Sequence, residues 1–337
     1  MIRTRTTLSL VGLAIAGLMI GGCSSGGGGT SPSGGGEALD PDNPVTIDVV
    51  RSAGGQFEPL MLGIEQGFFE EEGLEINVTA GTGNPVTLAP QLVSGQIQFA
   101  MIDSASPIAA VSQGVPIKML SVIQNDDPDI MSSAGILVPP DSDITTVADL
   151  EGATIATGQL AGLPVIATNL ALEKAGVPLE SIEWVQLTPD ALAEAATSGQ
   201  ADAILTFAAF FQGAIQNGFT FLEDTAASAS IPRVTQVAWA ASDKYIAESP
   251  EVVAAFLRAN QKAQDYADAN PDEVRRIDKE LTKLPEAYID NREIQPFSGP
   301  FHVDIMQQMA DAMLAQDFID TAVNVDEQLL WSEAERG

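Results

Sequence analysis

Apolar and polar residues follow two repeating patterns from about residue 45 onward. Short runs rich in β-branched residues, at 45–51, 74–79, 97–102 and 117–123, are typical of strands. The first three are each followed by a polar or glycine-bearing loop and then by apolar residues at helical spacing, as at 59–65. This succession of strand, loop and helix predicts α/β layers in which crossover helices connect parallel strands.

The pattern is interrupted by a polar, turn-rich stretch at 125–129 and begins again after 140. Strands are predicted at 153–157, 182–187 and 203–207, each followed by a helix. The folded part exceeds what one hydrophobic core usually holds, so we expect two lobes. The predicted division is 45–140 plus 236–337 for lobe 1 and 141–235 for lobe 2. Two chain crossings between the lobes predict a hinge and a cleft.

The N-terminal segment has a different pattern. Arg3 and Arg5 precede an apolar run at 8–20, which is shorter than the about 20 residues that a membrane span needs. Gly21 and Gly22 follow the run, and then comes Cys23, the only cysteine. This is the pattern of a lipoprotein signal peptide: residues 1–22 are predicted to be removed and Cys23 to carry a lipid. The lipid would hold the protein at the outer face of the cytoplasmic membrane or in the periplasm.

Residues 23–44 are rich in Gly and Ser and poor in apolar side chains, which predicts a flexible tether. The chain as a whole has a formal net charge of −31. Such a charge disfavours nucleic acid and anionic lipid head groups as partners. With one cysteine, no disulfide framework can form within the chain.

Ligands of open α/β sheets bind at the loops that follow the carboxyl ends of the strands. The sequence places these loops at 53–57, 82–85, 103–105, 158–164 and 207–211, with a further candidate position around 239. None of the loops contains Lys or Arg, so an anion would be held by backbone amides and polar side chains. The candidates for hydrogen bonding to a ligand are Gln56, Thr82, Asn84, Asp103, Ser104, Gly158 and Gln159. For Asp103 the alternative is a helix N-cap.

Aromatic residues at the same loops suggest stacking on a planar ligand. The candidates are Phe57, Phe207, Phe210 and Trp239. A neutral or aromatic ligand is thus at least as plausible as an anion. The alternative for Phe210 and its neighbour Phe211 is the core-facing side of the helix that starts near Ala208.

No sequence motif indicates catalysis. The chain lacks a Walker lysine motif, His-Glu-x-x-His and Gly-x-Ser-x-Gly, and its single histidine, His302, is interpreted as a surface or interface residue. The acidic residues at 125–129 lack the Gly and the terminal Glu of a calcium loop. We therefore predict a protein with no catalytic residues, no metal site and no cofactor.

Four segments carry a family resemblance: 64–76 (IEQGFFEEEGLEI), 92–100 (LVSGQIQFA), 147–156 (VADLEGATIA) and 195–203 (AATSGQADA). In this order they resemble periplasmic substrate-binding proteins of the nitrate/sulfonate/taurine and thiamin-pyrimidine-precursor type. The resemblance implies a type II periplasmic-binding fold with a ligand cleft between two lobes.

The resemblance also implies a function: capture of a small organic solute, either a sulfonate- or nitrate-type anion or a planar aromatic or pyrimidine compound. The expected partner is the permease of an ABC importer with its ATPase, and the protein is expected to act as a monomer. One alternative is a solute receptor that reports to a sensor system. The other, an enzyme similar to the thiamin-pyrimidine synthases, is disfavoured because those enzymes need a cysteine-rich motif and histidines.

Overall fold

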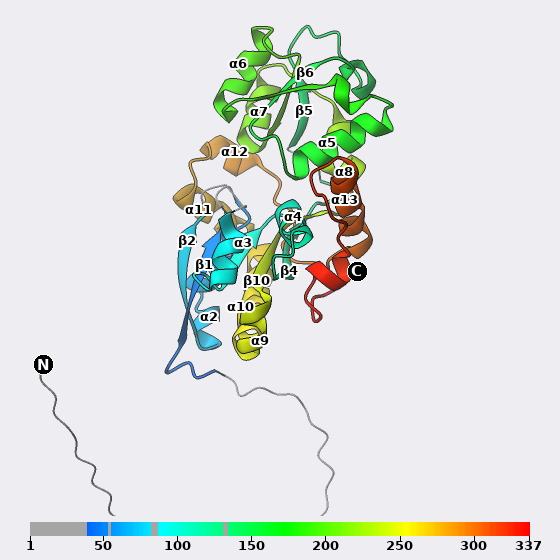
Figure 1. Ribbon diagram of the computed structural model, residues 1–337. Helices are drawn as coiled ribbons and strands as arrows, with labels where there is room; N and C mark the ends of the chain where they lie inside the picture. Colours follow the sequence, from blue (N-terminus) through cyan, green and yellow to red (C-terminus); the bar gives the residue numbers. More distant parts are fainter. Residues whose placement is uncertain (1–38, 53–54, 82–86, 131–133) are drawn as a thin grey trace, which may run out of the picture. The chain divides into compact units, whose positions relative to one another are not determined.

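The computed structural model describes residues 39–52, 55–81, 87–130 and 134–337, which all belong to one compact unit of the chain (Figure 1). The predicted signal peptide, the lipidation site Cys23 and most of the predicted tether lie outside these residues, as do Thr82 and Asn84. Within the described ranges, no helix combines the length and the apolar character that a membrane crossing requires.

The first sheet has five strands in the order β2-β1-β3-β10-β4. β1 pairs in parallel with β2 and β3, whereas β10 is antiparallel to both of its neighbours. We call this sheet and the helices packed on it lobe 1. The strand bounds are β1 Val45–Arg51, β2 Leu74–Ala80, β3 Phe99–Ile102, β4 Ile117–Asn125 and β10 Thr235–Ser242.

The second sheet, with its helices, forms lobe 2 and has the order β7-β6-β8-β5-β9. β6 is parallel to β7 and β8, and β5 is antiparallel to β8 and β9. The strand bounds are β5 Ala134–Val138, β6 Thr154–Thr157, β7 Glu183–Gln186, β8 Ala203–Phe207 and β9 Thr220–Phe221.

The strand pairing corrects one detail of the predicted lobes. We expected residues 135–138 in lobe 1, but β5 pairs with two strands of the second sheet. We therefore propose that lobe 2 begins before Ala134. The chain crosses from β4 to β5 and returns from β9 to β10, so two segments connect the lobes.

Helices follow most of the strands, as the alternating pattern predicted. Those of the first part of lobe 1 are α1 Glu58–Glu65, α2 Phe68–Glu71, α3 Leu88–Ser94 and α4 Ala105–Ser112. Those of lobe 2 are α5 Leu163–Lys174, α6 Leu192–Thr197, α7 Ala208–Gln216 and α8 Ala227–Ser230, with single 3-10 turns at 147–150, 179–181, 189–191 and 223–225.

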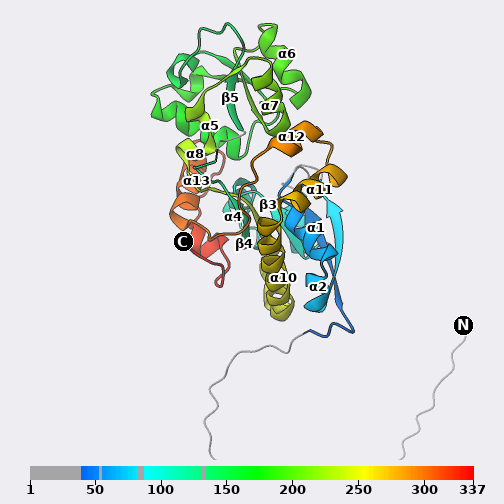
Figure 2. The same cartoon turned by 180° about the vertical axis from the view of Figure 1, so that it is seen from behind.

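The chain after β10 is mostly helical. Its elements are α9 Asp243–Glu248, α10 Pro250–Ala269, α11 Pro271–Leu281, α12 Glu286–Asn291, α13 Val303–Ala315 and a π-helical turn at Val325–Leu329. Both ribbon views show α12 and α13 at the level where the two lobes face each other (Figures 1 and 2).

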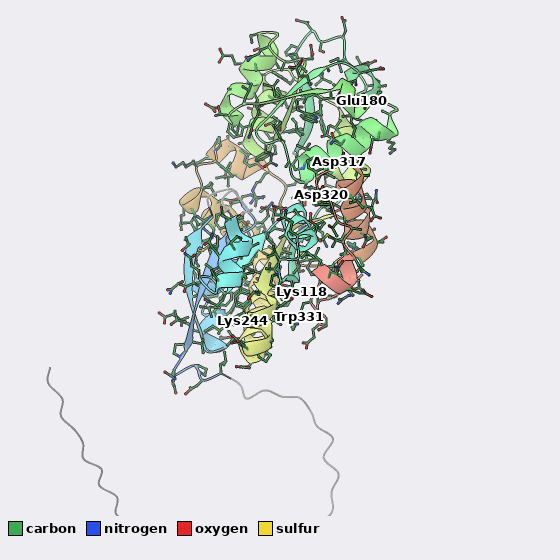
Figure 3. The ribbon with its side chains drawn as sticks, viewed as in Figure 1. Lys118, Glu180, Lys244, Asp317, Asp320 and Trp331 are labelled. Carbon is green, nitrogen blue, oxygen red and sulfur yellow. The ribbon has the colours of Figure 1, made fainter. Side chains whose placement is uncertain are left out.

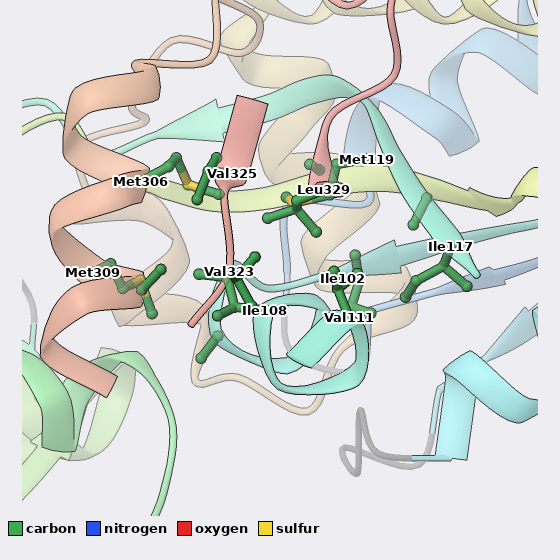
Figure 4. Close-up of a cluster of buried hydrophobic side chains, with 14 of the residues drawn as sticks. Ile102, Ile108, Val111, Ile117, Met119, Met306, Met309, Val323, Val325 and Leu329 are labelled. Atoms are coloured by element: carbon green, nitrogen blue, oxygen red, sulfur yellow. The ribbon is translucent and has the colours of Figure 1, made fainter. Parts of the chain in front are cut away.

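Hydrophobic residues cover both faces of the first sheet. On one face, Phe256 of α10 stacks on Phe99 of β3, with ring centroids 4.0 Å apart and planes 5° apart. On the other face, α4 and α13 contribute Ile108 and Met309 to a cluster with Ile102 of β3 (Figure 4). The sheet is therefore buried on both sides, as is usual for sheets with crossover helices.

The C-terminal segment lies along the outer strand of the first sheet. Leu330 forms a parallel bridge with Met119 of β4, and the Trp331 amide donates a 3.0 Å hydrogen bond to the Met119 carbonyl. Lys118 Nζ donates to the backbone carbonyls of Glu327 and Gln328, at 2.9 and 2.7 Å. Figure 3 labels Lys118 and Trp331 beside each other in this region.

Candidate ligand-binding site

A cavity of about 1710 Å³ is lined by residues of both lobes and by the segment that contains α12. Lobe 1 contributes the loops after β1 and β3, and lobe 2 contributes the loop after β6 and the junction of β8 with α7. Residues 284–297 form the third wall. The loops lie at the carboxyl ends of their strands, where open α/β sheets bind ligands. The volume is above the usual range for small-molecule pockets, about 300–1,000 Å³. A metabolite of moderate size therefore fits.

The lobe 2 wall is apolar and exposed. Phe207 and Phe210 each expose 45% of their surface, and Leu160 exposes 46%. Phe211, in contrast, is 1% exposed and packs edge-on against Phe221 with centroids 4.9 Å apart. Phe211 therefore faces the core, as the alternative interpretation of Phe210 and Phe211 predicted. Phe210 does not face the core.

The backbone between the two exposed rings has an uncommon conformation. Phe207 is the last residue of β8 and Ala208 is the first of α7, so no loop separates strand and helix. Ala208 has φ of +51°, in the left-handed region that non-glycine residues rarely adopt. Gln56, on the lobe 1 wall, also has a positive φ, of +60°. Strained residues of this kind concentrate at binding sites.

The polar side chains of the lobe 1 wall are partly engaged already. Asp103 Oδ1 accepts a 2.7 Å hydrogen bond from the Ser106 amide, and Oδ2 accepts one of 2.8 Å from the Ser106 hydroxyl. Asp103 therefore accepts hydrogen bonds from the first turn of α4 and also lines the cavity, so its contact with a ligand stays a prediction. Each of its oxygens keeps a second lone pair for a ligand.

The loop after β6 supplies Gly158 and Gln159 to the lobe 2 wall. Gly158 accepts a 3.2 Å hydrogen bond from Gln186 Nε2 through its carbonyl. A Cβ atom on Gly162, which has φ of +110°, would lie 3.3 Å from Gln159 Nε2. Glycine at this position lets the Gln159 side chain lie close to the backbone at the start of α5.

Arg292 of the third wall forms a charged triad with Glu58 of α1 and Asp278 of α11, which no sequence pattern indicated. Arg292 Nη2 donates to Glu58 Oε1 at 3.0 Å and to Asp278 Oδ2 at 2.5 Å, and Nε donates to Asp278 Oδ2 at 3.1 Å. Both carboxyl side chains are 1% exposed. Glu58 and Arg292 are 234 positions apart in the sequence, and no local motif links the three residues.

The two carboxyl groups of the triad also interact with each other. Burial raises the pKa of Glu58 from 4.5 to about 8, with further increases from the charge of Asp278 and from a side-chain hydrogen bond to it. Two carboxyl groups can form such a bond only if one of them keeps a proton. A carboxyl pair that shares one proton has one negative charge, which the Arg292 guanidinium offsets, so the triad has no net charge.

A second buried acid, Asp126, lies at the end of β4. It is 4% exposed, and burial raises its pKa. Oδ1 accepts a 2.9 Å hydrogen bond from Gln236 Nε2, whereas Oδ2 has no donor with hydrogen-bond geometry among the described residues. Asp126 and Gln236 both line the cavity.

The structure places six predicted ligand-binding residues on the cavity wall: Gln56, Asp103, Gly158, Gln159, Phe207 and Phe210. It places three in the core of lobe 1, which corrects their predicted role. Trp239 is 1% exposed and donates its indole N–H to Asn260, Phe57 is fully buried below the Arg51 guanidinium at 3.9 Å, and Ser104 donates to Met309 Sδ. None of the three lines the cavity.

Two residue types that often take part in catalysis or metal binding are absent from the described cavity wall. Neither Cys nor His lines the described cavity wall, and His302 precedes α13, away from that wall. In the same residues, no group of three or more His, Cys, Asp or Glu side chains is placed to hold a metal ion.

A family model described as "NMT1/THI5 like" matches residues 55–274. The chain belongs to this family. It is 28% identical over 222 residues to the formylaminopyrimidine-binding protein of Halalkalibacterium halodurans, a match that covers 65% of this chain and 64% of that protein. It is 26% identical over 246 residues to the riboflavin-binding protein RibY of Chloroflexus aurantiacus, covering 71% and 66%.

A yeast relative has the name of an enzyme. The 4-amino-5-hydroxymethyl-2-methylpyrimidine phosphate synthase THI13 of Saccharomyces cerevisiae is 24% identical over 225 residues, which covers 63% of this chain and 64% of that protein. Family membership by itself therefore fits both binding proteins and an enzyme, and the choice between them depends on the residues of the site.

Solved structures confirm the fold. The periplasmic aliphatic sulphonate binding protein SsuA of Escherichia coli matches with a TM-score of 0.71 and 20% identity, over 85% of this chain and 97% of that one. The nitrate-binding protein NrtA of Synechocystis matches with a TM-score of 0.60 and 15% identity, over 82% of both chains. The predicted periplasmic-binding-protein fold, with two α/β sheets, is thus confirmed.

Proposed function

We propose that this protein is the extracytoplasmic solute-binding component of an ABC importer. It captures a small organic solute between its two lobes and delivers it to a permease. The observation that carries the proposal is the cavity of about 1710 Å³, whose lobe 2 wall exposes Phe207 and Phe210. These two large aromatic side chains are exposed on the wall of the cavity between the lobes. Related proteins of this fold are named as solute-binding proteins, and such an exposed apolar surface suits contact with a ligand.

The proposed ligand has a flat apolar face. Phe207 and Phe210 offer ring faces for stacking, and glutamines on both lobes, among them Gln56 and Gln159, offer donors and acceptors. Groups from both lobes complete their contacts in a closed state, so binding favours closure of the lobes. The names of the pyrimidine- and riboflavin-binding relatives support a planar heterocycle.

The cavity wall argues against catalysis of the thiamin-pyrimidine-synthase type. Those enzymes need a cysteine-rich motif and histidines, and the described wall offers neither Cys nor His. We therefore propose a binding protein without enzymatic activity.

The location follows from the predicted signal peptide. We propose that Cys23 carries a lipid and that the segment between Cys23 and Leu39 tethers the lobes near the membrane. Leu39 itself packs against the core of lobe 1, so the proposed tether is shorter than the predicted range 23–44. Incorporation of radiolabelled palmitate into the chain in cells, with a Cys23→Ser variant as control, tests the anchor. Labelling that persists in the variant would contradict it.

A thermal-shift screen of the full chain tests the function. The panel contains aminopyrimidines, riboflavin, aromatic acids, alkanesulfonates and nitrate. A ligand present at 100 times its dissociation constant adds about 2.7 kcal/mol to the free energy of unfolding. A shift that disappears in a Phe207→Ala variant supports capture at this cavity, and a panel without any shift counts against solute capture.

A further inference from the structure

Arg292 is the only basic residue on the described part of the cavity wall. Its side chain is 19% exposed, and Nη2 and Nε donate hydrogen bonds to Glu58 and Asp278. The charge of the guanidinium is therefore already balanced by two buried carboxyl partners. An anionic ligand that reached the remaining donors on Nη1 would meet a triad without net positive charge.

Three further acids line the cavity: Asp103, Asp126 and Glu293. None of them forms an ion pair with a basic residue in the described part of the chain. With the triad neutral, these acids decide the charge of the cavity. A negatively charged ligand between the lobes would be repelled, and a positively charged one would be attracted.

The surroundings of Asp126 supply a further indication. It is 96% buried and lines the cavity, and Gln236 donates to its Oδ1. Oδ2 has no donor at hydrogen-bond distance and angle among the described residues, although the Gln295 side chain lies near enough to offset part of the rise in pKa that burial causes at Asp126. A buried acceptor without a donor costs about 1–3 kcal/mol, more if it is charged. A ligand with N–H groups would remove this cost, whereas a carboxylate or sulfonate, which only accepts hydrogen bonds, would not.

We infer that the cavity binds a planar organic cation whose N–H groups face the acids of lobe 1 and of the α12 segment, while its flat face lies on Phe207 and Phe210. This inference rests on the proposed function and specifies its substrate class. Arg292 then acts as a positioning residue that holds the α12 segment, and not as a counter-charge for the ligand. The sulfonate and nitrate that the structural neighbours' names indicate are therefore not ligands of this chain.

Three nearly isosteric probes separate charge from shape. Benzamidine is cationic and donates through four N–H bonds, benzamide is neutral, and benzoate is anionic and only accepts. We expect calorimetric titration of the full chain at pH 7 to give benzamidine a dissociation constant at least about tenfold below that of benzamide, which corresponds to 1.4 kcal/mol. Benzoate is expected to be weaker than both.

Variants locate the effect. Asp126→Asn keeps the shape of the side chain and removes its charge. It is expected to raise the dissociation constant of benzamidine by about tenfold and to change that of benzamide by less than about twofold. Glu293→Gln, on the exposed α12 segment, repeats the test without a risk to folding and is expected to give a smaller change of the same sign. Glu180→Gln, in lobe 2 outside the cavity wall, is the matched control for the loss of one acid (Figure 3).

The outcomes distinguish the two proposals. Benzamide or benzoate binding as tightly as benzamidine, with Phe207-dependent affinity, would overturn the cation inference and leave solute capture intact. An equal loss for all three probes in Asp126→Asn would also overturn it, because a structural role affects them alike. Failure of all three probes and of the whole thermal-shift panel would overturn both.

Discussion

The indole N–H of Trp239 donates a 2.7 Å hydrogen bond to Oδ1 of Asn260, and both residues are buried at the interface of β10 and α10. Asn260 in turn donates to Gln264 Oε1, and Gln264 Nε2 donates to the Val122 carbonyl of β4. This chain of polar contacts crosses an otherwise apolar cluster and fixes the position of α10 on the sheet.

Asn260→Ala is expected to lower the free energy of unfolding by about 1–3 kcal/mol, because it leaves the buried indole N–H without an acceptor. Ligand affinity should not change, since neither residue lines the cavity. Urea unfolding and calorimetric titration of the same sample measure both effects. A loss of ligand affinity in Asn260→Ala at unchanged stability would indicate that Trp239 contacts the ligand after all.

Phe207 and Phe211 form a matched pair in one short segment. Phe207→Ala is expected to weaken an aromatic ligand by at least about tenfold with little effect on stability, because the ring is exposed at the cavity. Phe211→Ala is expected to cost about 3–5 kcal/mol of stability, because its buried ring packs on Phe221. Urea unfolding and ligand titration of both variants measure the two effects. A loss of affinity in Phe211→Ala together with a loss of stability in Phe207→Ala would contradict the assignment of Phe207 to the cavity wall and of Phe211 to the core.

Ala208→Gly relieves a left-handed backbone at the junction of β8 and α7. Removing the Cβ atom is expected to raise the free energy of unfolding by up to about 1 kcal/mol. Glycine at position 208 also gives the backbone more conformational freedom. The position of the neighbouring Phe207 ring is then less fixed, so aromatic ligands should bind more weakly. The urea midpoint and the dissociation constant are the two readouts, with Gly213→Ala on the same helix as a control for composition. A less stable variant would show that Ala208 is not strained.

The pKa of Glu58 predicts a pH dependence of stability. Because its pKa is raised from 4.5 to about 8 in the folded state, folding favours the protonated form. The stabilisation is complete below pH 4.5 and is lost as the pH rises through about 8, with a slope of at most about 1.4 kcal/mol per pH unit. Asp126, whose pKa is also raised, contributes with the same sign.

Glu58→Gln mimics the protonated side chain and is expected to flatten the decrease in stability between pH 6 and pH 8. Urea unfolding at three pH values measures the slope, and Glu180→Gln is the control. An unchanged slope in Glu58→Gln would mean that the carboxyl pair does not share a proton.

Local patterns predicted much of the fold because strand and helix periodicities depend on neighbouring residues. β1 and β8 have the predicted bounds, and α7 starts at Ala208 as predicted. The pattern could not decide which sheet the run at 134–138 joins, because a continuous apolar strand fits either one. β5 was assigned to the wrong lobe for this reason.

The cavity wall was predictable in part from the ends of strands. Gln56, Asp103 and Phe207 lie on this wall because they stand at or shortly after the carboxyl ends of strands, and their contact with a ligand stays a prediction. Trp239 was misplaced because both faces of a central strand are buried, so alternation does not show which side faces a ligand. Arg292 and Asp278 were missed because long-range packing of α11 and α12 brings them to Glu58.

The bridge between Met119 and Leu330 also bears on the solubility of this acidic protein. β4 is the last strand of its sheet, and an open strand edge is a template for pairing with other molecules. Here the chain's own C-terminal residues occupy that edge through backbone hydrogen bonds and the contacts of Lys118. Leu330 and Trp331 thus cover the edge of β4 and disfavour edge-to-edge aggregation of the sheet. They lie outside the cavity wall, so this effect does not depend on a ligand.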